Sequence, residues 1–289
     1  MRIAITGGRG FIGAHVEHWA REYGHDVSFF DKREGNDIMG DLSALRGADA
    51  VIHLAGVLGT LEMFSFVERA AEINVVGTAR IAQWCLDNEA QYVGILVPDV
   101  FPSIYCATKA GAKRITDVLH SELGLRVAHV TAFNAHGPGQ AYGTGHPRKF
   151  GPTFSMAAWR NEPIPIWGDG SALVDPVRAS DVGRMLVDAA ILEGDNVVYD
   201  GGTGVAVTVN DIAKEVLRIT GSVASPGIAY EPMRIGEDPR GNVAATGLGW
   251  ERLDWRPSTD WETALEETVH WYRPFAREEW VREIQSGLS

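Results

Sequence analysis

The chain has 289 residues, of which 45% are hydrophobic, and a formal net charge of −12 at pH 7. This composition is typical of a globular protein with a sizeable core, and its acidic balance argues against nucleic-acid binding, which needs clustered Lys and Arg. The two cysteines form neither a disulfide framework nor a metal-ligand spacing, and no apolar stretch approaches the roughly 20 residues that span a bilayer. With no leader-like segment before the first apolar run, we expect a cytoplasmic protein without a metal, nucleic-acid or membrane partner.

Short apolar runs alternate with helical patterns through the first half of the chain. Strands are expected at 3–6, 27–31, 50–54, 92–97 and 126–131, and helices at 12–23, 67–88 and 105–123. This alternation predicts βαβ units and an α/β fold with a doubly wound parallel sheet of the Rossmann type.

After Asn134 the pattern changes. Residues 137–152 are rich in Gly, Pro and His, which indicates a loop. Beyond it we expect a helix at 181–192, a strand at 196–199, a helix at 208–219 with Thr208 as N-cap, and a helix at 259–272. We therefore predict a Rossmann domain over 1–140, rejoined by about 177–203, and a smaller C-terminal substrate-binding lobe over 141–176 and 204–289, with the ligand cleft between them.

The run Thr6-Gly7-Gly8-Arg9-Gly10-Phe11-Ile12-Gly13 joins the first predicted strand to the first predicted helix. Its glycines permit a tight turn and a close approach of the backbone to a pyrophosphate, while the helix N-terminus supplies N–H donors. Asp31 ends the second strand, where its carboxylate can accept hydrogen bonds from the adenosine ribose. Asp31 favours NAD because it would repel a 2′-phosphate, but the basic Lys32 and Arg33 leave NADP open.

Tyr105 and Lys109 share one face of the helix predicted at 105–123. A phenol with its ordinary pKa of about 10 is a poor base at neutral pH. A neighbouring ammonium and the positive charge of an oxidised nicotinamide would favour the phenolate. A dinucleotide site with such a base suggests hydride chemistry at a carbinol or a ketone.

These motifs resemble the extended short-chain dehydrogenase/reductase family, particularly its nucleotide-sugar epimerases and dehydratases. The similarity covers nearly the whole chain and includes residues 41–42, 53–56, 74–78, 133–139 and 167–171. It implies a homodimer built on helices 67–88 and 105–123, with Asp41 and Leu42 near the adenine and Lys109 on the nicotinamide ribose. The cofactor-binding residues that it implies are Gly7, Gly10, Phe11, Ile12, Gly13, Asp31, Lys32, Asp41, Leu42, Leu54, Ala55, Gly56, Asn74, Tyr105 and Lys109.

The resemblance also implies a nucleoside-diphosphate sugar as substrate. Asn134, Lys149 and Arg234 match or lie near positions that hold the diphosphate, although Arg234 could equally be a solvated surface residue. Where the family usually has an Arg before Asp175, this chain has Val174, and Arg178 could supply the charge from another angle.

A second departure concerns the reacting hydroxyl. The family carries a Ser or Thr at the end of the fourth strand, but this chain has Val97, which can neither donate nor accept a hydrogen bond. Ser103 or Thr60 could substitute. Asp99 falls where dehydratases and decarboxylases have an acidic residue, so it is a candidate acid or base, or simply a loop residue after Pro98.

We therefore predict an NAD-dependent nucleotide-sugar epimerase that oxidises a sugar hydroxyl transiently, at C4, with Tyr105 as base. A dehydratase that uses Asp99 is the first alternative, and an NAD(P)-linked reductase of another small carbonyl is the second. Val97 and Val174 motivate a third, a dinucleotide-binding protein without catalysis, against which the retention of both Tyr105 and Lys109 argues.

Overall fold

A six-stranded parallel sheet forms the centre of the molecule, in the order β11-β5-β4-β3-β1-β2. The computed structural model describes residues 1–192, 194–276 and 283–285. The strands are β1 (Arg2–Thr6), β2 (Asp26–Phe30), β3 (Ala50–His53), β4 (Gln91–Leu96), β5 (Val127–Ala132) and β11 (Asp195–Gly201). The chain order reverses beside β1, and ligands bind outside the carboxyl ends of parallel strands at such a point. The predicted α/β fold is confirmed.

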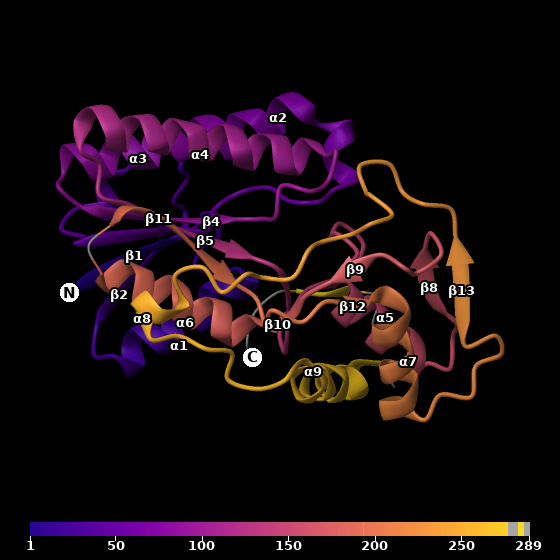
Figure 1. Ribbon diagram of the computed structural model, residues 1–289. Helices are drawn as coiled ribbons and strands as arrows, with labels where there is room; N and C mark the ends of the chain where they lie inside the picture. Colours follow the sequence, from indigo (N-terminus) through magenta and orange to yellow (C-terminus); the bar gives the residue numbers. More distant parts are fainter. Residues whose placement is uncertain (193, 277–282, 286–289) are drawn as a thin grey trace.

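Helices cover both faces of this sheet (Figure 1). One face carries α1 (Phe11–Glu22) and α6 (Ala179–Ile191), and the other carries α2 (Val67–Ala71), α3 (Gly77–Asp87) and α4 (Ile104–Leu123). Alternate residues of β1 supply the two cores, because successive strand side chains point to opposite faces: Ile3 and Ile5 pack on the α1 and α6 side, and Ala4 on the other.

The helix predicted at 67–88 is interrupted. Between α2 and α3 the backbone forms a π-helical turn, η4 (Glu72–Val76), which contains the buried Asn74. Such turns lie frequently at functional sites. Short 3-10 turns follow β2 and β3: η1 (Lys32–Glu34), η2 (Ser43–Leu45) and η3 (Glu62–Ser65).

The remaining segments form a smaller unit beside the sheet (Figure 1). Its strands pair two by two: β6 (Asn134–His136) with β10 (Pro176–Arg178), β7 (Tyr142–Gly143) with β14 (Glu283–Ile284), β8 (Ile164–Trp167) with β13 (Ile228–Glu231), and β9 (Leu173–Val174) with β12 (Val207–Thr208). Its helices are α5 (Phe150–Trp159), α7 (Val209–Thr220) and α9 (Trp261–Ala276), and α8 (Trp250–Leu253) lies against α6.

The N-terminus of α7 forms as the sequence predicts. The Thr208 hydroxyl accepts a hydrogen bond from the Asp211 N–H, and the Asp211 carboxylate accepts one from the Thr208 N–H, which is a capping box. Phe154, Ile212 and Leu265 bring α5, α7 and α9 together in a third core.

Since β11 extends the large sheet and α6 packs on it, we propose the domain division predicted from the sequence, with one change: α8 and the buried Trp255 pack in the core of the large sheet and belong with it. No helix in the described part of the chain is long and apolar enough to cross a membrane.

Candidate active site

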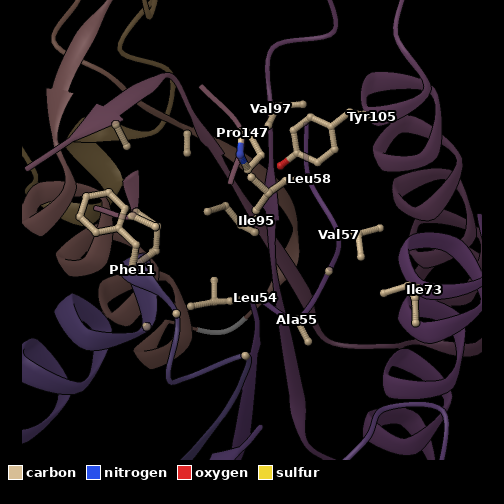
Figure 2. Close-up of a pocket in the computed structure, with 18 of the residues that line it drawn as sticks. Phe11, Leu54, Ala55, Val57, Leu58, Ile73, Ile95, Val97, Tyr105 and Pro147 are labelled. Carbon is tan, nitrogen blue, oxygen red and sulfur yellow. The ribbon is translucent and has the colours of Figure 1, made fainter. Parts of the chain in front are cut away.

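A cavity of about 710 Å³ lies at the carboxyl ends of β1 to β5, beside the smaller unit. Figure 2 shows it open between the glycine turn that carries Phe11, the segment after β3, and Tyr105 on α4. Of the residues predicted for the site, the cavity is lined by Gly7, Gly10, Phe11, Ile12, Gly13, Asp31, Lys32, Leu54, Ala55, Gly56, Tyr105, Lys109, Asn134 and Lys149. One cavity therefore brings together the glycine turn, the acid after β2 and the Tyr–Lys pair.

The glycine turn has no room for side chains. Gly7 has φ +67°, and a Cβ there would lie 2.7 Å from the Ala55 nitrogen. A Cβ on Gly13 would lie 2.3 Å from the Gly8 carbonyl oxygen. Helix α1 begins after Gly10, which gives it no side-chain cap, so the first N–H groups remain open to an anion. The turn fits a pyrophosphate.

The Asp31 carboxylate is held in place at the end of β2. It accepts hydrogen bonds from the Arg33 N–H at 2.9 Å and the Arg9 N–H at 3.0 Å. Lys32 forms an ion pair with Asp37 at 3.0 Å, and the Arg33 guanidinium donates to the Arg9 carbonyl at 2.5 Å. The two basic side chains that left NADP open are thus engaged with neighbouring groups, which favours NAD.

Tyr105 and Lys109 lie on the first turns of α4, which Ser103 caps by accepting from the Cys106 N–H at 3.2 Å. The Lys109 ammonium donates to the Ile95 carbonyl at 3.1 Å, and burial lowers the Lys109 pKa to about 8. Burial raises the pKa of Tyr105, with a smaller contribution from Cys106. In the protein without cofactor, desolvation of the phenolate is the main cause of this raised pKa. The lowering that we predict from Lys109 and an oxidised nicotinamide together stays a prediction.

Asn74 forms hydrogen bonds to the segment of the cavity wall that contains Val57. Its side-chain oxygen accepts from the Val57 N–H at 2.9 Å, and its amide nitrogen donates to the Val57 carbonyl at 3.0 Å and to the Thr108 hydroxyl at 3.1 Å. Asn74 thus joins the wall segment after β3 to α4 and holds it in position, although it does not itself line the cavity.

The predicted substrate-binding residues are divided between the cavity and its surroundings. Asn134 lines the cavity, and its side-chain oxygen accepts from the Asp175 N–H at 3.1 Å. Lys149 also lines the cavity, and its side chain is exposed. Desolvation, followed by the charge of Arg234, lowers the Lys149 pKa. Arg178 instead pairs with Glu267 at 2.8 Å and is not among the described lining residues.

Arg234 lies behind Lys149 and outside the lining. Its guanidinium stacks over the Trp167 ring at 4.3 Å and pairs with Glu237, and its Nε is buried without a hydrogen-bond partner among the described residues. It is therefore a partly buried residue and not a solvated surface arginine.

Four further residues that the sequence singled out are also outside the described lining. Asp99 is exposed in a turn after β4. The Asp41 carboxylate accepts from the Ser43 N–H at 2.9 Å, and Leu42 packs against the core beneath α3. Val174, which replaces the family arginine, is buried in the third core.

Among the described residues that line the cavity, no Ser or Thr replaces the missing family hydroxyl. Val97 lines the cavity, whereas Ser103 caps α4 and Thr60 donates to Glu237 at 3.2 Å. Neither of these hydroxyl residues is among the described residues that line the cavity.

Gln140 is a lining residue that the sequence did not single out. It is 9% exposed, and its Oε1 has no hydrogen-bond partner among the described residues. Its main-chain carbonyl accepts from the Tyr272 hydroxyl at 2.5 Å, which holds the loop onto α9. Because this contact is distant in sequence, no local pattern could have indicated it.

The family model described as the NAD dependent epimerase/dehydratase family matches residues 3–96 and 99–198, so the chain belongs to this family. The predicted family and its NAD dependence are thereby confirmed.

Curated relatives agree with this membership. A trifunctional UDP-glucose 4,6-dehydratase/UDP-4-keto-6-deoxy-D-glucose 3,5-epimerase/UDP-4-keto-L-rhamnose-reductase of Arabidopsis thaliana is 30% identical over 99% of this chain and 49% of its own length. The chain thus spans about half the length of this relative.

Solved structures share the fold. MoeE5 in complex with UDP-glucose and NAD has a TM-score of 0.85 and 26% identity over 95% of this chain and 99% of that one. UDP-glucose 4-epimerase of Thermotoga maritima in a structure with UDP-glucose has a TM-score of 0.84 and 24% identity, with 95% and 99% of the two chains covered.

Proposed function

We propose that the protein is an NAD-dependent nucleotide-sugar epimerase that oxidises a sugar hydroxyl transiently, at C4, with Tyr105 as the base. The supporting observation is that Tyr105 and Lys109 line the same cavity as the glycine turn and Asp31. A binding protein without catalysis would need the cofactor residues but not the phenol.

The glycine turn and the open N-terminus of α1 would hold the pyrophosphate, Asp31 the adenosine ribose, and Lys109 the nicotinamide ribose. NAD supplies, when bound, a reversible hydride acceptor and a positive charge that offsets the effect of burial on the phenol. The Tyr105 oxygen would take the proton from the sugar hydroxyl as hydride passes to the nicotinamide. After the ketone has turned its other face to the nicotinamide, the hydride would return and Tyr105 would give the proton back.

The position of Asp99 favours an epimerase over a dehydratase. Water elimination needs an acid or base at the neighbouring carbon. Asp31 is the sole acidic residue among the described residues that line the cavity, and Asp99 is exposed outside it. A dehydratase remains the second candidate because the relatives include 4,6-dehydratases.

The test is incubation of the NAD-loaded protein with UDP- and dTDP-hexoses in D₂O, followed by chromatography and mass spectrometry. We expect an isomer of unchanged composition without carbon-bound deuterium, formed without accumulation of NADH. Loss of water would identify a dehydratase, and stoichiometric NADH a plain dehydrogenase. No product from any sugar, with NAD demonstrably bound, would favour the protein without catalysis.

A further inference from the structure

The hydroxyl of Tyr105 faces an apolar wall. Figure 2 shows its oxygen directed into the cavity between Leu58 and Pro147, with Val97 beside the ring. These residues come from the segment after β3, the loop before α5 and the residue that follows β4. In this view (Figure 2), apolar side chains from three separate parts of the chain therefore lie around the reacting oxygen. The polar His146 and Lys149, on either side of Pro147 in the sequence, also line the cavity.

Two observations point to a ligand group that would cover this wall. Leu58 is 46% exposed although it lines the cavity, so an apolar group placed against it would remove its side chain from water. Val97 lies beside the Tyr105 ring in this view (Figure 2). The hydroxyls of Ser103 and Thr60, the two candidate substitutes, form hydrogen bonds elsewhere. A sugar hydroxyl placed against Leu58, Pro147 and Val97 would give up water without gaining a hydrogen-bond partner from these three side chains.

We infer that this wall selects a deoxy sugar. In such a substrate the carbon next to the reacting carbinol carries a methyl group, where common hexoses carry a hydroxymethyl group. This inference rests on the proposed function, since it assigns the substrate class of the same site. An apolar pocket discriminates between such groups by about tenfold to a hundredfold.

The test compares glucose with 6-deoxyglucose, each as the UDP and the dTDP derivative. Turnover is followed on the NAD-loaded wild-type protein. Affinity is measured by calorimetry on the NAD-loaded Tyr105→Phe variant, which separates binding from catalysis. We expect the 6-deoxy compound to be preferred about tenfold or more in both kcat/KM and Kd.

Val97→Thr provides the decisive variant, because it places a hydroxyl on the wall at nearly constant volume. We expect it to reduce the preference to about twofold, mainly by improving the glucose compounds. The matched control is Val57→Thr, the same change in the same cavity but away from the Tyr105 hydroxyl (Figure 2), and we expect it to leave the preference unchanged.

The outcomes separate the two proposals. Equal or tighter binding of the glucose compounds would overturn the inference, and turnover of those compounds would still support the proposed function. Preference for the 6-deoxy compounds without turnover would support the inference and count against the epimerase. If none of the four compounds binds, both are wrong.

Discussion

The ammonium of Lys109 donates a hydrogen bond to the main-chain carbonyl of Ile95 across 3.1 Å. This contact joins helix α4, which carries Tyr105, to the end of strand β4 beneath the cavity. Lys109 is 8% exposed, and burial lowers its pKa to about 8. A charge held here favours the proposed chemistry but opposes folding, as is common at functional sites.

Lys109→Met should therefore abolish activity while stabilising the protein without cofactor by about 1–3 kcal/mol at pH 7. The lysine pKa is lower in the folded state, at about 8, than the ordinary value of about 10.4. Between these values the unfolded state binds more protons, so wild-type stability should rise with pH and the advantage of the variant should shrink. Urea unfolding at pH 7 and pH 9.5 checks this. Equal stability of the two proteins at pH 7 would contradict it.

Tyr105→Phe should lower kcat by about a hundredfold to ten-thousandfold, because the variant cannot take the proton from the sugar hydroxyl. NAD affinity should fall much less, since the glycine turn, Asp31 and Lys109, which we propose hold most of the cofactor, are unchanged in this variant. The measurement is product formation together with titration of NAD by intrinsic fluorescence. Activity close to that of the wild type would show that Tyr105 is not the base.

Gly13→Ala should weaken NAD binding by at least about tenfold, since the added Cβ would lie 2.3 Å from the Gly8 carbonyl oxygen and displace the turn. Gly111→Ala is the matched control. A Cβ at Gly111 would meet nothing closer than the Val75 side chain at 3.9 Å. Calorimetric titration with NAD should show wild-type affinity for the control and a loss for Gly13→Ala only.

Asp31→Asn should lower the affinity for NAD relative to NADP by about tenfold, because it removes the charge that would repel a 2′-phosphate and keeps a hydrogen-bond acceptor. Asp41→Asn should leave both affinities unchanged, since Asp41 bonds to Ser43 and does not line the cavity. Loss of NAD affinity in Asp41→Asn would instead support the role near the adenine that the family resemblance implies.

The homodimer stays a prediction from the family resemblance. Helix α4 leaves Val118 43% exposed and Leu123 60% exposed, which is consistent with a contact between copies. Light scattering should give twice the chain mass of 31.4 kDa, and Val118→Glu should shift the protein towards the monomer. A monomeric wild type would make this prediction wrong.

The sequence by itself determined the sheet, the glycine turn and the α7 cap. These features depend on short-range patterns: the alternation of apolar runs, the spacing of Gly7, Gly10 and Gly13, and the reciprocal Thr208–Asp211 pair. The pairing of Tyr105 and Lys109 also depends on a short-range pattern, since one helical turn is enough to put them on the same face.

The tertiary structure alone decided which polar groups reach the cavity. Arg178 pairs with Glu267 and Arg234 with Glu237, and neither is among the described lining residues. The sequence offers Arg234 as a match to a family position and Arg178 as a substitute for the arginine that Val174 replaces. Leu58 and Pro147 meet at Tyr105 only through the fold. Sequence patterns report local periodicity, whereas ion pairs and cavity walls depend on contacts between distant segments, and burial then sets the pKa of each group.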